Sequence, residues 1–425
     1  MNILITNFHS CCNAGDRAIL AVTLRQIAQS YPQAMVTVAV NDIATYQTLR
    51  HERTVPSFYS WAIRPDAQNH AQLVRWVTPI YAMLLVLIAC VYRLTRIRVY
   101  GWADSTRRKT LQAYFDADLV MACGGGYLFA SATAGSWFLI LWLIAAFGAM
   151  LGKKTVLLPQ SIGPLEASWQ RRVVGWLVQR SALTLVREQT SRQLLQAMGV
   201  EKNVQVHPDI AFDFNPTIHL TDKTPNCLSG ASFHVGMTLL NWVAQGNRSF
   251  EQNGYERAAL RLIEHVGSLG GRVHLFAQVR GPFFADDDRV VAQRILEQSN
   301  PQHVVWHSDI VDSESLFAAY GHMDFFVATR LHSAIFAMNQ SVPTLVVGYL
   351  HKSVGVLREL NLEHWCVPIE QTNAQNIIEC FEELHRQKAA VQSQLRNYIP
   401  VAQAQAAQTV AQIRAHLETE RGAHP

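Results

Sequence analysis

Short apolar runs alternate with helical patterns along most of the chain. The first run, residues 2–7, leads through a loop at 8–15 into apolar positions spaced three or four residues apart, from Ala18 to Ile27. This pattern predicts a strand, a loop and a helix. Further strands are expected at residues 35–40, 119–122, 155–158 and 184–186. Because strands and helices alternate, we expect a parallel sheet covered by helices.

The second half of the chain repeats this alternation. It predicts a helix at 255–266 and strands at 235–240, 272–276, 304–306, 325–328 and 344–347. A polar stretch with several prolines and glycines, residues 215–232, is typical of an interdomain linker.

These patterns predict an α/β protein with two doubly wound, Rossmann-like domains that face a cleft. We expect an N-terminal domain at 1–220, a C-terminal domain at 231–400, and a terminal helix (402–418) and tail within 401–425. Ligands of such sheets bind at the carboxyl ends of the strands.

Two apolar stretches interrupt the alternation. Residues 137–151 lie where a crossover helix buried on the sheet is required. Residues 77–92 carry no charge and are followed by Arg93, Arg96 and Arg98, but they fall short of the roughly 20 residues of a straight membrane span. Two interpretations stay open for this insertion: a segment at an anionic membrane surface, or a helix packed on the first domain.

Charge and cysteine content narrow the functional classes. A chain of 425 residues with a net charge of +4 and no arginine-rich stripe gives no reason to expect nucleic-acid binding. Seven scattered cysteines without a CxxC pair predict reduced thiols in the cytoplasm, and no metal site is expected. Residues 1–8 lack the basic start of a signal peptide and read as the first strand.

The strongest candidate site follows the strand at 325–328. Arg330, His332 and Ser333 stand where a helix should begin. Unpaired N–H groups and the helix dipole attract anions there, so Arg330 and Ser333 could bind a phosphate or carboxylate while His332 transfers a proton. The alternatives are an ion pair between Arg330 and an acid, and a capping role for His332.

The turn after the first strand contains Asn13, Gly15 and Asp16. Glycine permits a tight turn, and Asp16 could cap the helix that follows. If the turn faces the cleft, the same carboxylate could accept a proton from a sugar hydroxyl.

Other candidates also follow predicted strands. The glycines at 124–126 would let a ligand approach the backbone, but they lack the GxGxxG spacing for NAD, and there is no P-loop. Arg187 could bind a ligand or pair with Glu188, and Asp209 could be a turn residue. His351 and Lys352 repeat the arrangement of cations at a strand end.

Taken in order, several short motifs closely resemble the polysaccharide pyruvyl transferase family of colanic acid and other exopolysaccharide biosynthesis. The motifs are residues 13–19, the triple glycine, 160–164, Arg187-Glu188 with Ser191, Pro208-Asp209, 330–333 and 351–353. The resemblance implies a fold similar to GT-B glycosyltransferases. It also implies transfer of pyruvate from phosphoenolpyruvate to a sugar, or to its lipid-linked precursor, as a ketal.

The resemblance gives the candidates roles. His332 would protonate the enol carbon beside Arg330, and Asp16 would act as the base for the acceptor. The donor-binding candidates are Arg330, Ser333, Arg187, His351 and Lys352. The acceptor or cleft candidates are Asn13, Gly15, Gly124, Gly125, Gly126, Gln160 and Asp209. Phosphoenolpyruvate is then a co-substrate with no resident cofactor, and the need for a divalent ion is open. We expect a cytoplasmic protein, with attachment to the inner face of the membrane open.

One departure from the family pattern affects the donor site. Leu240 and Asn241 stand where related sequences often have an arginine. The missing arginine has three possible consequences: a different pose of the donor, compensation by Arg280, or an altered activity. Residues 287–289, Asp-Asp-Arg, do match the sequence pattern of the family. We expect them to begin a helix with acidic capping.

Two other functions remain open from the sequence. One is a GT-B-like glycosyltransferase that uses a nucleotide sugar, since the fold supports many chemistries. The other is a non-catalytic glycan-binding subunit of a polysaccharide assembly.

Overall fold

The computed structural model divides into two compact units. It describes residues 1–42, 53–65, 71–73, 77–101, 103–131, 135–216, 230–243 and 250–422. Unit 1 comprises Met1–Cys11, Ile19–Ile210 and Gln405–Pro425, and unit 2 comprises Cys12–Ala18 and Ala211–Ala404. This division differs from the expected domains in three places. Residues 12–18 group with unit 2, unit 2 resumes at Ala211 and not after residue 220, and the C-terminal residues group with unit 1. Most of the expected linker, residues 217–229, lies outside the described part.

Unit 1 is built on an eight-stranded sheet in the order β10-β9-β8-β6-β1-β2-β3, with β7 paired to β8. All of these pairings are parallel, and Ile3 aligns with both Val36 and Leu119. The strands are β1 (Asn2–Phe8), β2 (Met35–Val40), β3 (Arg53–Pro56), β6 (Leu119–Ala122), β7 (Gly125–Ala130), β8 (Lys154–Leu165), β9 (Leu183–Val186) and β10 (Val204–Val206). A small antiparallel pair, β4 (Ile63–Pro65) and β5 (Ala71–Leu73), stands apart from this sheet.

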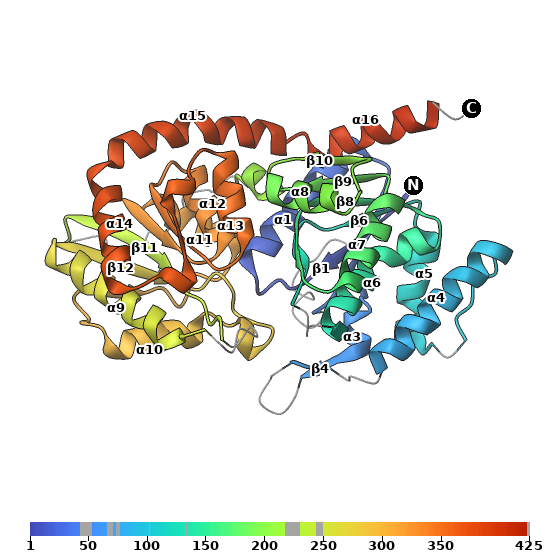
Figure 1. The fold of residues 1–425 in the computed structure, drawn as a ribbon, viewed down its shortest axis with the longest axis horizontal. Helices are drawn as coiled ribbons and strands as arrows, with labels where there is room; N and C mark the ends of the chain where they lie inside the picture. Colours follow the sequence, from blue (N-terminus) through green and yellow to red (C-terminus); the bar gives the residue numbers. More distant parts are fainter. Residues whose placement is uncertain are drawn as a thin grey trace. The chain divides into compact units, whose positions relative to one another are not determined.

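Helices cover the sheet of unit 1 (Figure 1). They are α1 (Ala14–Ser30), α3 (Tyr59–Ala62), α4 (Val77–Thr95), α5 (Ser105–Asp116), α6 (Gly135–Met150), α7 (Ser168–Arg180), α8 (Gln189–Ala197) and α16 (Thr409–Gly422). The long apolar stretch at 137–151 is the buried helix α6, as predicted. Tyr114 of α5 donates its hydroxyl to the Ile144 carbonyl of α6 at 2.7 Å, which fixes the two helices against each other.

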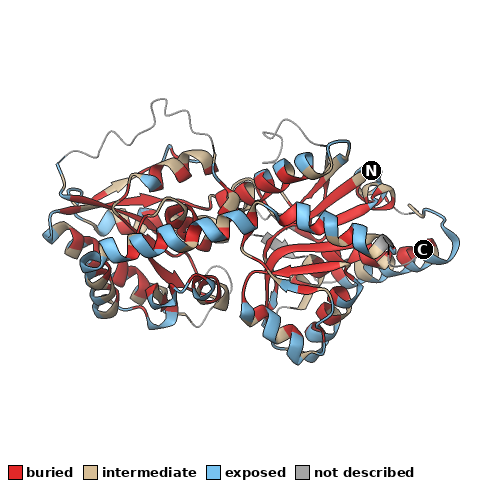
Figure 2. Cartoon of the chain, turned by 90° about the horizontal axis from the view of Figure 1, so that it is seen from above, coloured by how far each residue is buried: buried red, intermediate tan, exposed pale blue. Residues whose placement is uncertain are grey.

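Unit 2 has a six-stranded, wholly parallel sheet in the order β13-β12-β11-β14-β15-β16. Its strands are β11 (Phe233–Thr238), β12 (Gly271–Phe276), β13 (Val304–Trp306), β14 (Phe325–Ala328), β15 (Thr344–Gly348) and β16 (Cys366–Pro368). Its helices are α9 (Gln252–Ser268), α10 (Arg289–Gln298), α11 (Ser313–Gly321), α12 (Leu331–Asn339), α13 (His351–Glu359), α14 (Ala374–Arg386) and α15 (Lys388–Ala406). Figure 2 shows buried strands in each unit, flanked by helices with exposed outer faces.

Two Rossmann-like units with parallel sheets confirm the predicted fold class. Several elements differ from the prediction, which did not include strands β3, β4, β5, β10 and β16. The expected terminal helix is two helices, α15 and α16, separated at residues 407–408, and the triple glycine runs directly into a strand, β7, that was not predicted.

Helix α4 is the insertion expected at residues 77–92. Within the described residues, Thr78–Thr95 is the one helix whose length and apolar composition would allow it to cross a membrane, and 28% of it is buried. Leu85, Ile88 and Ala89 are buried, and α4 contacts α6, so one face of the helix packs on unit 1. That packing agrees with the second interpretation of the sequence. It leaves the opposite face exposed.

Candidate functional site

Two helices of unit 2 begin side by side at the same edge of the sheet. Strands β14 and β15 are parallel neighbours, with Ala328 aligned to Val346, and they lead into α12 and α13 respectively. The free N–H groups of both helix starts therefore lie at the carboxyl ends of adjacent strands. This is the position where open α/β sheets bind ligands and where anions are favoured.

Arg330 is the residue that caps the start of α12, and it is held by an acid. It is 9% exposed, and its Nε and Nη2 donate to Asp288 Oδ1 at 3.1 and 2.6 Å. Burial raises the pKa of Asp288 to about 6 although the Arg330 charge opposes this, so Asp288 is ionised at neutral pH. Arg330 thus forms the ion pair that the sequence left open. A guanidinium has five N–H donors, so the pairing fixes the group without exhausting it.

The two neighbouring acids Asp287 and Asp288 bind different groups. Asp287 Oδ1 accepts the backbone N–H of Arg289 at 3.0 Å and caps α10, whereas Asp288 accepts from Arg330 and from the Val279 N–H. The expected acidic capping is therefore supplied by Asp287. Asp288 positions the arginine.

Tyr349 is a site residue that the sequence reasoning missed. Burial alone would raise the pKa of Tyr349, but the charges of Lys352 and Arg330 and their hydrogen bonds to the phenol outweigh burial and lower it. Lys352 Nζ also lies 5.0 Å from the centre of the tyrosine ring. Two cations from two helix starts therefore act on the same phenol. We call Arg330, Tyr349 and Lys352 the anion cluster.

The first turn of α1 completes this region of unit 2. Ala14 N–H donates to the Gln278 carbonyl at 3.0 Å, and Arg280 N–H donates to the Cys12 carbonyl at 2.9 Å, so the segment Cys12–Ala18 is bonded to the end of β12. A Cβ atom added to Gly15 would lie 2.0 Å from His332 Nδ1. The imidazole therefore packs directly on the Gly15 backbone, which only glycine permits.

Asn13, and not Asp16, caps this helix. The Asn13 Oδ1 accepts the N–H groups of Gly15 and Asp16 at 3.0 and 3.3 Å. Asp16 lies in the first helical turn. Capping was one of the two roles expected of Asp16, and the structure gives it to Asn13.

Ser333 and His351 are placed differently from each other. The Ser333 hydroxyl is fully buried, and it bonds the Arg330 carbonyl at 2.7 Å and Thr238 Oγ1 at 2.8 Å. These two hydrogen bonds hold the Ser333 side chain at the start of α12, and its expected contact with the donor stays a prediction. His351 is the first residue of α13 and is half-buried. In sequence it directly precedes Lys352 of the anion cluster.

Two of the unit 1 candidates, Arg187 and Asp209, belong to a buried polar network. Arg187 makes a salt bridge with Asp209, and both side chains are almost fully buried. Arg187 Nη2 also donates to Ser161 Oγ at 2.8 Å, and Ser161 donates to Glu188 at 2.8 Å. The partner of Arg187 is therefore Asp209 and not Glu188. These contacts give Arg187 and Asp209 a structural explanation that needs no ligand.

The triple glycine has a packing explanation as well. A Cβ on Gly124 would lie 2.7 Å from the Pro159 carbonyl oxygen, so glycine is required where this turn meets β8. Gly125 has a φ of +148°. Gly126 continues into β7, and the buried Gln160 lies in β8.

Leu240 and Arg280 are the residues of the departure from the family pattern. Leu240 is fully buried just after β11, and Arg280 directs Nη1 to the Ser308 carbonyl at 2.9 Å. Lys352 is the second cation beside Arg330.

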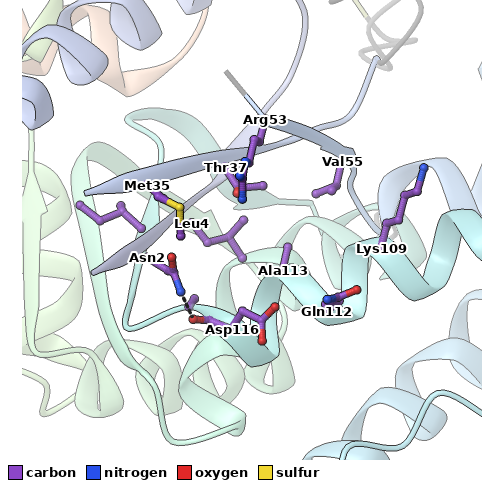
Figure 3. A pocket seen from close by; sticks show the side chains of 12 residues that line it. Asn2, Leu4, Met35, Thr37, Arg53, Val55, Lys109, Gln112, Ala113 and Asp116 are labelled. Carbon is purple, nitrogen blue, oxygen red and sulfur yellow. Dashed lines mark hydrogen bonds between the residues drawn. The ribbon is translucent and has the colours of Figure 1, made fainter. Parts of the chain in front are cut away.

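A pocket of about 260 Å³ in unit 1 has none of these candidates in its lining. Figure 3 shows it between β1–β3 and α5, lined by Asn2, Thr37, Arg53 and Lys109. Asn2 and Met35 are the first residues of their strands, so the pocket lies toward the amino ends, opposite the edge where ligands of such sheets bind. Within the part of the chain that the structure describes, no group of three or more His, Cys, Asp or Glu side chains could hold a metal ion.

Comparisons with known proteins agree with the sequence motifs. The sequence pattern of the family described as polysaccharide pyruvyl transferase matches residues 13–351. The amylovoran biosynthesis protein AmsJ of Erwinia amylovora is 23% identical over 424 residues, covering 93% of this chain and 96% of that protein.

Two solved structures illustrate the likeness of the fold. A putative UDP-N-acetylglucosamine 2-epimerase from Listeria monocytogenes superposes with a TM-score of 0.63 at 12% identity, over 98% of this chain and 96% of that chain. HepE from Anabaena, in complex with UDP-glucose, gives a TM-score of 0.54 at 16% identity, over 99% and 100%. At these identities the likeness establishes the fold alone.

Proposed function

Because this chain belongs to the polysaccharide pyruvyl transferase family, we propose that it moves pyruvate from phosphoenolpyruvate onto a sugar as a ketal. The acceptor is a sugar of an exopolysaccharide or of its lipid-linked precursor, in keeping with the relative from amylovoran biosynthesis. The observation that carries the proposal is the convergence of Arg330 and Lys352 at two adjacent helix starts. Phosphoenolpyruvate has a phosphate and a carboxylate, and such a site supplies two cations and two sets of N–H donors.

The proposed reaction has two steps. His332 delivers a proton to the methylene carbon of the enol, and the first sugar hydroxyl adds to the neighbouring carbon as it loses its proton to Asp16. A second hydroxyl then displaces phosphate, its proton leaves with the products, and the ketal closes. Arg330 and Lys352 stabilise the phosphate and carboxylate throughout, which is electrostatic catalysis by a fixed site. The close packing of His332 on Gly15 supports a shared role for α12 and the first turn of α1.

The location of the protein is part of the proposal. All six described cysteines are free thiols, which supports a reducing compartment such as the cytoplasm. A lipid-linked acceptor would be met at the inner face of the membrane.

The decisive experiment measures thermal stability with phosphoenolpyruvate, UDP and UDP-glucose. A ligand present at about 100 times its Kd stabilises the folded state by about 2.7 kcal/mol, which should raise the Tm by roughly 3 °C when all 425 residues unfold together. We expect this shift with phosphoenolpyruvate alone, followed by phosphate release when a glycan acceptor is added. A shift with UDP-glucose and none with phosphoenolpyruvate would overturn the proposal in favour of glycosyl transfer.

A matched pair of lysine variants tests the site itself. Lys352→Ala should weaken phosphoenolpyruvate binding roughly 10- to 100-fold, because it removes a charged hydrogen bond. Lys388→Ala is the control, since Lys388 pairs with Asp324 at the opposite end of β14, 2.6 Å away, and should leave binding unchanged. Equal loss in both variants would contradict the assignment.

A further inference from the structure

Helix α4 presents two apolar faces, and only one of them is covered. Leu85, Ile88 and Tyr92 are buried and recur at helical spacing. Ile80, Met83 and Leu87 recur with the same spacing on another face and are 52%, 66% and 58% exposed. Large apolar side chains in such a row are unusual on a monomer and mark an interaction surface.

A groove beside this exposed face has an apolar floor. It has a volume of about 510 Å³ and lies among α4, α6 and α7 of unit 1. Its apolar lining is Val86, Ala89, Cys90, Trp142, Met150, Val173 and Trp176. Trp142 is fixed there by a 2.9 Å hydrogen bond from Nε1 to the Val173 carbonyl. Such a groove suits a hydrocarbon chain.

The groove also carries three positive charges. Arg93 from α4 and Arg172 and Arg180 from α7 line it together with the apolar residues, and the Arg180 guanidinium lies 5.4 Å from the centre of the Trp176 ring. Among the described residues, no acidic side chain forms an ion pair with any of the three. No acidic residue lines the groove either. An occupant with a negative head and an apolar chain would satisfy both kinds of lining.

We propose that α4 and this groove dock unit 1 on an anionic lipid bilayer. The exposed row Ile80, Met83 and Leu87 enters the boundary between headgroups and chains, while one lipid places its chain on the groove floor and its phosphate among Arg93, Arg172 and Arg180. The α4 helix lies on the surface and does not span it, because its other face is buried against α6. This site is separate from the anion cluster of unit 2 and does not depend on the proposed reaction.

The test is flotation of the full-length protein with two kinds of vesicle in the absence of phosphoenolpyruvate. We expect binding to vesicles of equal parts phosphatidylglycerol and phosphatidylcholine, and much weaker binding to phosphatidylcholine alone. Arg172→Ala with Arg180→Ala should weaken binding roughly 25-fold, at about fivefold for each arginine near an anionic surface. Met83→Glu with Leu87→Glu should abolish binding, because it places two negative charges in the apolar row that enters the bilayer. Both side chains are exposed, so the substitutions should not disturb the fold.

Control variants distinguish binding through this surface from non-specific binding to vesicles. Val401→Glu changes an exposed apolar residue of α15 in unit 2, 57% exposed, and should bind like the wild type. Unchanged melting of each variant shows that it is folded. The proposal fails if the wild type floats with neither vesicle, if it floats equally with both, or if soluble glycerol phosphate at the same phosphate concentration displaces it. Concentration-dependent dimerisation that Met83→Glu with Leu87→Glu removes, without vesicle binding, would assign the face to a second copy and also overturn it.

Discussion

The imidazole of His332 rests on the backbone of Gly15, at a distance that leaves no room for a side chain: a Cβ on Gly15 would come within 2.0 Å of Nδ1 and 2.3 Å of Cγ. The contact joins the start of α1 to the start of α12 inside unit 2. Any residue larger than glycine must therefore move the histidine.

Gly15→Ala should lower turnover far more than it weakens phosphoenolpyruvate binding. The added methyl displaces the His332 ring but leaves Arg330 and Lys352 in place, and a misplacement of about 1 Å can cost roughly 100-fold in rate. Steady-state kinetics would give a fall in kcat with a nearly constant KM. Gly135→Ala, where a Cβ meets nothing within 4 Å, is the matched control. Wild-type turnover in Gly15→Ala would remove His332 from the mechanism.

Tyr349 should ionise at a lower pH than a free phenol. Its lowered pKa comes from the Lys352 and Arg330 charges, which outweigh burial. A folded-state pKa below the unfolded value near 10 adds stability as pH rises through the folded pKa, and this gain is lost as pH falls through it. The stability difference between wild type and Tyr349→Phe should therefore grow toward pH 10.

Ultraviolet absorbance of the phenolate measures the same group directly. The buried tyrosines Tyr114, Tyr127, Tyr255 and Tyr320 have raised pKa values and stay protonated in this range. An early phenolate signal should thus disappear in Tyr349→Phe. Identical titrations of the two proteins would show that the cations do not act on this hydroxyl.

Arg187 should matter for stability and not for donor binding. Arg187→Ala removes the ion-pair partner of the buried Asp209, which should lower the free energy of unfolding by about 3–5 kcal/mol. The double variant Arg187→Met with Asp209→Leu removes both charges and should recover most of that loss. Its affinity for phosphoenolpyruvate should equal that of the wild type in a binding titration. A large loss of affinity in this folded variant would restore Arg187 as a donor-binding residue.

A chain of three histidines should make unit 2 sensitive to acid. His274 is fully buried and bonds His234 and His307, each across 2.9 Å. Burial, together with the charges of His307, His234 and Arg272, lowers the pKa of His274 to about 3. The unfolded chain binds the proton near pH 6.5, so stability is present above that pH and is lost as pH falls toward 3.

The comparison with His274→Gln isolates this effect. Between pH 6.5 and 4.5 the wild type should lose roughly 2 kcal/mol more stability than His274→Gln in denaturant titrations. The raised pKa of Asp288 has the opposite effect on the pH dependence of stability. Asp288 is present in both proteins, so its effect cancels in the difference between them. His364→Gln, an exposed histidine, should match the wild type. Parallel pH curves for wild type and His274→Gln would contradict the prediction.

The fold was predictable because the alternation of strands and helices is a local property of the sequence. Strand β7 was missed because Gly125 and Gly126 resemble a turn more than a strand, and its pairing with β8 is what makes it one. The break between α15 and α16 was missed for the opposite reason, since the alanine- and glutamine-rich sequence around residues 402–418 favours helix throughout.

The candidate site was predictable only in part. The rule that a cation just after a strand marks a candidate site selects both Arg330 and Lys352. The structure places them at adjacent helix starts because β14 and β15 are neighbouring strands. The same rule also selected Arg187, since spacing does not reveal whether a strand-end arginine faces a ligand or a buried acid. Asp288 and Tyr349 were missed as partners of Arg330, because their contacts depend on strand order. The catalytic and binding roles themselves stay predictions.

The membership of residues 12–18 in unit 2 affects how such proteins could diversify. A recombination event with its junction between residues 216 and 230 would exchange His332 and the anion cluster while it left Gly15 and Asp16 behind. The hybrid would carry two intact sheets and a mismatched contact at the histidine. Exchange of donor or acceptor preference between relatives is therefore expected to require compensating changes at the very beginning of the chain, far in sequence from the segment that was exchanged.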